Sequence, residues 1–136
     1  MKKFNYYGLF LDQMEKERVL KHIFSNYYEI TKRKNSDFIT MYLDHCTLLH
    51  NSQCNEEIKS FCDIHKNEKF NITITDIGFS DKAIALKIDL DSIPCTNKTP
   101  HITIATFEGG KPVDSNNIKY WTPIEPIIIK TTLKKV

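Results

Sequence analysis

The spacing of apolar residues along the chain predicts a domain that mixes short strands with two amphipathic helices. Apolar residues recur every three or four positions over 15–28 and 55–65, the period of a helix with one buried face. The residues expected on these buried faces are Val19, Leu20, Ile23, Phe24 and Tyr27 in the first helix and Ile58, Phe61 and Cys62 in the second. Alternating or β-branched runs predict strands at 6–12, 38–50, 70–79, 83–90, 101–107 and 127–133. A short helix is expected over 113–120, after a turn at 109–112.

The order of these elements, β-α-β-α-β-β-β-(α)-β, is typical of an α+β fold built on antiparallel strands. With 136 residues, the chain is expected to form a single domain over 1–136 with its own core. A net charge of +2 is too small to indicate nucleic-acid binding by itself. Length and composition therefore limit the possible fold classes, and the function has to be inferred from individual residues.

Two of the predicted strands carry the same motif, His-x-Thr-x, at 45–48 (His-Cys-Thr-Leu) and at 101–104 (His-Ile-Thr-Ile). Strand side chains alternate between faces, so each histidine shares a face with the threonine two residues later. The opposite faces carry apolar residues that suit a buried layer. The same alternation points Cys46 into the core, which argues against a role as nucleophile. It also turns Asp44 to the face opposite His45. Two such copies make a specific signal.

These residue types suit the cleavage of a phosphodiester. Near neutral pH one imidazole can accept a proton from the nucleophile while the other protonates the departing oxygen. A threonine hydroxyl on the same face can donate to a phosphate oxygen. We therefore expect His45 and His101 to be the catalytic acid and base, and Thr47 and Thr103 to hold the phosphate. No carboxylate cluster accompanies them, so no metal or other cofactor is expected.

The two motifs resemble those that define the 2H phosphoesterase superfamily. The stretches at 94–100 and 111–116 look most like the cyclic phosphodiesterase domains of fungal and plant-type tRNA ligases and their RNA-repair relatives. The resemblance implies a bilobal fold, in which two antiparallel sheets with flanking helices surround a central groove. It also implies metal-independent hydrolysis of 2′,3′-cyclic phosphate RNA ends or related 2′-linked nucleotides. It suggests His101 as base and His45 as acid, whereas the residues alone leave that assignment open.

Two other functions stay open at this point. Some similar enzymes, compact viral versions among them, degrade 2′-5′ oligoadenylate or cyclic oligonucleotide signals. A non-catalytic RNA-binding module would keep the groove without the chemistry, although the intact histidines and threonines argue against it. In each case the expected ligand is an RNA end or a small (oligo)nucleotide.

The expected setting is the cytoplasm, with no membrane, no obligate protein partner and a monomeric state. The chain shows no signal-peptide pattern at its start and no apolar run of the roughly 20 residues that cross a bilayer. Its four cysteines show no close pairing, which fits a reducing compartment.

Several further residues are candidates for a role in binding. Tyr7, beside a glycine, and Trp121, in a polar segment, are predicted to contact a nucleotide base. A zinc site can be formed from residue types such as those at His50, Cys54, Cys62 and His65. Their spacing is not that of a standard zinc finger, so packed cysteines and surface histidines are favoured. Ser115 and Asn116 are expected to cap the short helix.

Overall fold

The structure is a computed structural model that describes residues 4–32, 39–107 and 109–136. Within these ranges it does not describe the side chains of residues 24–41. Its elements in chain order are β1 (Tyr6–Phe10), α1 (Gln13–Lys32), β2 (Ile39–Met41), β3 (His45–His50), α2 (Glu56–His65), β4 (Lys69–Phe79), β5 (Ala83–Asp89), β6 (His101–Phe107), the 3-10 helix η1 (Pro112–Asn117) and β7 (Trp121–Lys135). The predicted helices and strands are present with shifts at their ends, except that the strand expected over 38–50 is divided into β2 and β3 by residues 42–44. The side chains of Phe24 and Tyr27 lie outside the described residues.

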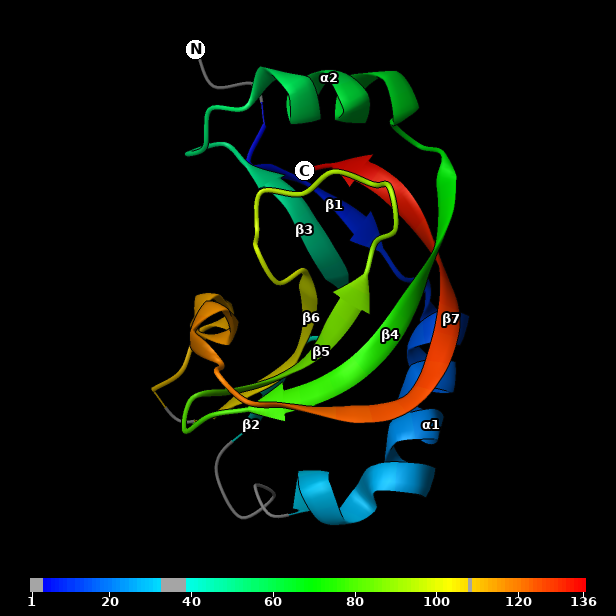
Figure 1. The fold of residues 1–136 in the computed structure, drawn as a ribbon, viewed down its shortest axis with the longest axis vertical. Coiled ribbons are helices and arrows are strands. Elements are labelled where there is room, and N and C mark those ends of the chain that lie inside the picture. Colours follow the sequence, from blue (N-terminus) through cyan, green and yellow to red (C-terminus); the bar gives the residue numbers. More distant parts are fainter. Residues whose placement is uncertain (1–3, 33–38, 108) are drawn as a thin grey trace.

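The strands of the described chain form a single antiparallel sheet in the order β2-β6-β3-β1-β7-β4-β5. Strand β6 also pairs with β5, so six of the strands close into a barrel in the order β6-β3-β1-β7-β4-β5 (Figure 1). The expected bilobal α+β fold with two separate sheets is therefore wrong. The molecule is mostly sheet, with few helices.

Strand β7 is the physical reason for this difference. It begins at Trp121, not at Ile127 as predicted, and it runs for 15 residues. Its length lets it pair with β4 from Gly78 to Lys69 and with β1 over its last residues, so it joins β4 and β1 in one sheet (Figure 1). Prolines usually exclude a central strand. Pro123 is accommodated next to the β-bulge that shifts the β4–β7 register between Ile74 and Asp76.

The core is continuous and takes buried side chains from β1, from β3 to β7 and from both α-helices. The apolar partners of both motifs belong to it, as predicted: Cys46, Leu48 and Ile102 are fully buried, and Ile104 is 5% exposed. Because one face of β3 and of β6 is buried, the alternation of strand side chains turns the motif histidines and threonines to the other face. No helix among the described residues is long and apolar enough to cross a membrane.

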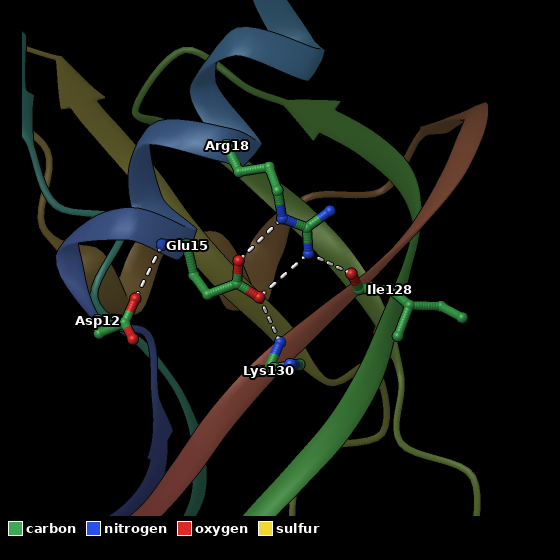
Figure 2. A network of polar contacts seen from close by, with 5 residues as sticks. All are labelled: Asp12, Glu15, Arg18, Ile128 and Lys130. Carbon is green, nitrogen blue, oxygen red and sulfur yellow. Dashed lines mark hydrogen bonds and ion pairs between the residues drawn. The ribbon is translucent and has the colours of Figure 1, made fainter.

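Helix α1 covers an edge of β7 that pairs with no strand among the described residues. Strand β1 pairs with β7 only over Thr132–Lys135, so the preceding backbone groups on that side need other partners. Side chains of α1 provide them (Figure 2): Glu15 accepts from the Lys130 N–H at 2.7 Å, and Arg18 donates to the Ile128 carbonyl at 2.5 Å. Glu15 and Arg18 also pair with each other, and Asp12 caps the helix by accepting from the Glu15 N–H at 2.9 Å. This cover protects an edge that could otherwise pair with another chain.

We expect Glu15→Ala to lower the free energy of unfolding by about 1–3 kcal/mol, because the Lys130 N–H and the Arg18 guanidinium both lose their acceptor. Arg18 lowers the pKa of the Glu15 carboxyl. The carboxylate's contribution is therefore complete above the unfolded carboxyl's pKa and is lost as the pH falls through the lowered folded value. Urea denaturation at several pH values measures both effects. Glu17→Ala, an exposed change on the same helix, is the matched control, and an equal loss in both variants would contradict the role of Glu15.

Candidate active site

The two motif strands are neighbours in the sheet. β3 and β6 pair antiparallel, with Cys46 opposite Ile102. Cys46 and Ile102 both point into the core, so the histidines and threonines on either side of them point to the opposite face. The pairing thus brings the polar faces of the two motifs side by side.

A cavity of about 390 Å³ opens over this pair of strands. All four predicted catalytic residues line it: His45, Thr47, His101 and Thr103. The remainder of the lining comes from the ends of neighbouring elements and from the turns between them: Tyr42, Asp44, His50, Ser52, Gln53, Asn97, Pro112, Val113 and Asn116. A cavity of this size suits a small ligand.

The His45 ring is positioned by strand β1. It packs nearly parallel to the rings of Tyr6 and Phe10, with a centroid distance of 4.8 Å in each case. Gly8 lies between these two aromatics, and a Cβ there would come within 3.3 Å of His45 Cδ2 and 3.2 Å of the Cys46 carbonyl oxygen. The missing side chain at Gly8 thus lets the imidazole lie close to the strand. His45 Nδ1 is buried and has no hydrogen-bond partner within the described chain.

His101 is oriented by its own backbone neighbourhood. Its Nδ1 lies 2.8 Å from the carbonyl oxygen of Thr99, which can only accept. In the neutral ring the proton is therefore on Nδ1, and Nε2 carries the lone pair. This leaves Nε2 of His101 as the ring nitrogen that can take a proton from a ligand.

Burial lowers the pKa of both imidazoles. Desolvation is the largest cause at His45, where the Asp44 carboxylate opposes it and the charge of His101 adds to it. At His101 desolvation is again the largest cause, and the hydrogen bond to Thr99 opposes it. Each ring is thus harder to protonate than an exposed histidine, and charging one disfavours charging the other.

Helix η1 forms one wall of the cavity and contacts the second motif directly. The Thr103 hydroxyl lies 2.8 Å from the hydroxyl of Ser115, which is 1% exposed. The cap of η1 comes from Asp114, whose carboxylate accepts from the Lys111 N–H at 2.8 Å. The predicted capping role of Ser115 is therefore wrong, because its hydroxyl bonds to β6 and not to the helix start. Asn116 lines the cavity.

Asp44 also lines the cavity, contrary to the prediction that it faces away from His45. Alternation fails here because residues 42–44 are not in a strand, and Leu43 has a left-handed backbone with φ of 54°. Leu43 turns into the core, and Asp44 pairs with Lys16 of α1 at 2.7 Å. None of the described residues that line the cavity is a lysine or an arginine.

The comparisons with known proteins identify the family of the chain. A sequence model of the fungal tRNA ligase phosphodiesterase domain matches residues 1–124. The chain belongs to this family. The predicted resemblance to the cyclic phosphodiesterase domains of fungal tRNA ligases is thereby confirmed, and the family is one of RNA-processing phosphodiesterases.

A structure search adds support at the level of the fold. The crystal structure of a fungal RNA kinase is similar to this phosphodiesterase domain with a TM-score of 0.64 and 15% identity. The match covers 97% of this chain and 45% of the kinase chain, so this domain spans less than half of that protein. No curated protein matches the chain.

The structure does not bring the two predicted base-contacting residues of the phosphodiesterase domain to the cavity. Tyr7 is fully buried, and its hydroxyl donates to the Asp63 carboxylate, which ties β1 to α2. Trp121 starts β7 and packs against Gly78, outside the cavity lining. The sequence reasoning missed Tyr42, an aromatic three positions before His45, and Val113, an apolar residue in the segment that resembles the family.

The alternative Cys/His set does not gather in the described part of the phosphodiesterase domain. No three His, Cys, Asp or Glu side chains there lie close enough together to hold a metal ion. Cys62 is buried in the core, as predicted, and all four cysteines are free. His50 bonds to Ser52, and His65 pairs with Glu68.

We expect the imidazoles of His45 and His101 to titrate below the ordinary histidine value of about 6.5, because both are desolvated. The unfolded chain then binds more protons than the folded one between the lowered values and about 6.5. The free energy of unfolding should therefore fall as the pH drops through that window. NMR titration of the ring protons and denaturation across the window measure the two effects. Midpoints above about 6.5 at both residues would contradict the burial argument.

Proposed function

We propose that this domain hydrolyses 2′,3′-cyclic phosphate ends of RNA, or related 2′-linked nucleotides, by acid–base catalysis from His45 and His101 without a metal. The observation that carries the proposal is the convergence of both motifs in one cavity. Two imidazoles and two hydroxyls on adjacent strands meet there in the combination that phosphodiester cleavage needs.

His101 is the better candidate for the general base. The Thr99 carbonyl holds its Nδ1 proton, so Nε2 can take a proton from water. That water oxygen then attacks phosphorus, and the bond from phosphorus to one ribose oxygen breaks. The hydrogen bond to Thr99 also stabilises the imidazolium that forms.

His45 is the better candidate for the general acid. Its ring packs on the faces of Tyr6 and Phe10, and aromatic faces attract a cation. Desolvation lowers the pKa of this ring overall, and the Asp44 carboxylate opposes it by favouring the charged form. The protonated ring can then deliver its proton to the departing ribose oxygen. These contacts support the assignment of His101 as base and His45 as acid.

The threonines and the cavity walls complete the proposed site. Thr47 and Thr103 donate to the non-bridging phosphate oxygens, where charge builds up in the transition state. The described part of the lining carries no lysine or arginine, so the proposed donors to the phosphate there are these hydroxyls and the imidazolium. Tyr42 and the 61% exposed Val113 offer apolar surface to a base. Asn97, Gln53 and Asn116 offer amides to its edge.

A substrate panel tests the proposal. The panel contains RNA that ends in a 2′,3′-cyclic phosphate, 2′-5′ oligoadenylate, and cyclic di- and trinucleotides, with products identified by mass spectrometry. Cleavage of the 2′,3′-cyclic phosphate end supports the proposal. Cleavage of 2′-5′ oligoadenylate or of cyclic oligonucleotides without it favours a signal-degrading enzyme. Tight binding with no turnover favours a binding module and overturns the proposal.

We expect His45→Ala and His101→Ala each to lower kcat by about 10²–10⁴-fold, because each removes a proton-transfer group. The double variant should lose much less than the product of the two single losses, since the two groups act on one transition state. Steady-state assays on the selected substrate measure this. His65→Ala, a histidine outside the cavity lining, is the control. Near-full activity in either motif variant would falsify the two-histidine mechanism.

We expect kcat/KM to follow a bell-shaped pH profile with its optimum below about 6.5, because both imidazole pKa values are lowered. At low pH the base is protonated, and at high pH the acid has lost its proton. The two limbs report values for the coupled pair rather than for one histidine. Assays across the pH range in excess EDTA check this. Loss of activity in EDTA that a divalent ion restores would contradict the proposed chemistry.

A further inference from the structure

We propose that Ser115 is a positioning residue: its hydroxyl donates to Thr103 Oγ1 and so leaves the Thr103 proton for the phosphate. This inference rests on the proposed function and deepens it. It concerns a residue outside both motifs, on η1, that reaches the site only through the fold.

The direction of the hydrogen bond follows from the burial of Ser115. The side chain is 1% exposed, and Thr103 is its only hydrogen-bond partner in the part of the chain that the structure describes. A hydroxyl carries one donor, and a buried donor without an acceptor is costly. The Ser115 proton is therefore satisfied when Thr103 Oγ1, 2.8 Å away, accepts it. The proton of Thr103 then points elsewhere.

Thr103 has a weak resting acceptor for that proton. The carbonyl oxygen of Pro112 lies 3.4 Å from Thr103 Oγ1, which is long for a bond between a hydroxyl and a carbonyl. Pro112 also lines the cavity. A phosphate oxygen at a normal hydrogen-bond distance outcompetes this contact. The Ser115 bond stays in place during the exchange and polarises the Thr103 hydroxyl, which makes it a better donor.

Small residues on the sheet let η1 lie close enough for Ser115 to contact Thr103. Thr103, Ala85 and Gly78 lie across from one another on β6, β5 and β4. A Cβ at Gly78 would come within 2.8 Å of Ile118 Cγ2 and 2.7 Å of Trp121 Cε3. The missing side chain lets the segment that follows η1 lie against the sheet. Helix η1 itself is closed by the Asp114–Lys111 contact, so Ser115 is held from both ends.

The two motifs differ in this respect, and the difference supplies a control within the molecule. Thr103 is held by Ser115, whereas the Thr47 hydroxyl has no hydrogen-bond partner among the described residues. A residue that acts through Thr103 should depend on Thr103 and not on Thr47. A residue that merely stabilises η1 should affect all backgrounds equally.

The test is a pair of double-mutant cycles that combine Ser115→Ala with Thr103→Val and with Thr47→Val. We expect Ser115→Ala to lower kcat/KM by roughly 10-fold and to weaken the binding of phosphate, because the Thr103 proton is then no longer directed to a phosphate oxygen. In the Thr103→Val background the same change should have almost no effect. In the Thr47→Val background it should keep most of its effect, since Ser115 contacts Thr103 and not Thr47. Ser115→Cys, a weak donor of similar size, should fall between serine and alanine.

Equal losses from Ser115→Ala in all three backgrounds would overturn the proposal, and so would no loss in any of them. The same cycles are run on the Kd for inorganic phosphate, which needs no turnover. A domain that turns over no member of the panel contradicts the proposed function, and the phosphate cycle still decides the role of Ser115. Urea denaturation of each variant shows whether it is folded. Ser115→Cys replaces Ser115→Ala in the cycles if the alanine variant does not fold.

Discussion

The pairing of β6 with both β3 and β5 is the constraint on which the rest of the structure depends. It closes the sheet, and it places the two His-x-Thr strands next to each other. One face of each strand must then be apolar, because it faces the core. The other face is free to carry polar side chains. The core and the proposed catalytic groups thus use opposite faces of the same two strands.

The polar face of β3 and β6 depends on two nearby glycines, whose lack of a side chain lets other groups lie close to the sheet. Gly8 lets His45 lie against β1 between two aromatic rings, and Gly78 lets the segment after η1 approach the sheet. The first contact orients the imidazole proposed as the acid. The second supports the helix whose Ser115 reaches Thr103. Close approach of backbone to a functional group is a common reason for glycine within a strand.

The electrostatic character of the cavity follows from its position in the fold. Its histidines are partly desolvated, which lowers the pKa of both rings, and Asp44 partly opposes this at His45 alone. The sole acidic side chain in the described lining is that of Asp44, which is held by Lys16. The two imidazoles therefore have different surroundings, which is what an acid and a base that act together require.

The sequence by itself determined the local features. Period-two alternation predicted which residues of 45–48 and 101–104 are buried, and helical spacing predicted both α-helices, because these patterns depend on neighbours a few positions away. The family also followed from the motifs and their flanks. Only the tertiary structure decided what depends on distant pairing or on a break in local regularity. The length of β7 turned two expected sheets into one, and the left-handed Leu43 turned Asp44 into the cavity. Contacts of α2 and η1 took Tyr7 away from the site and brought Ser115 to it. Alternation carries no information beyond the strand in which it occurs, so these placements could not be read from the order of residues.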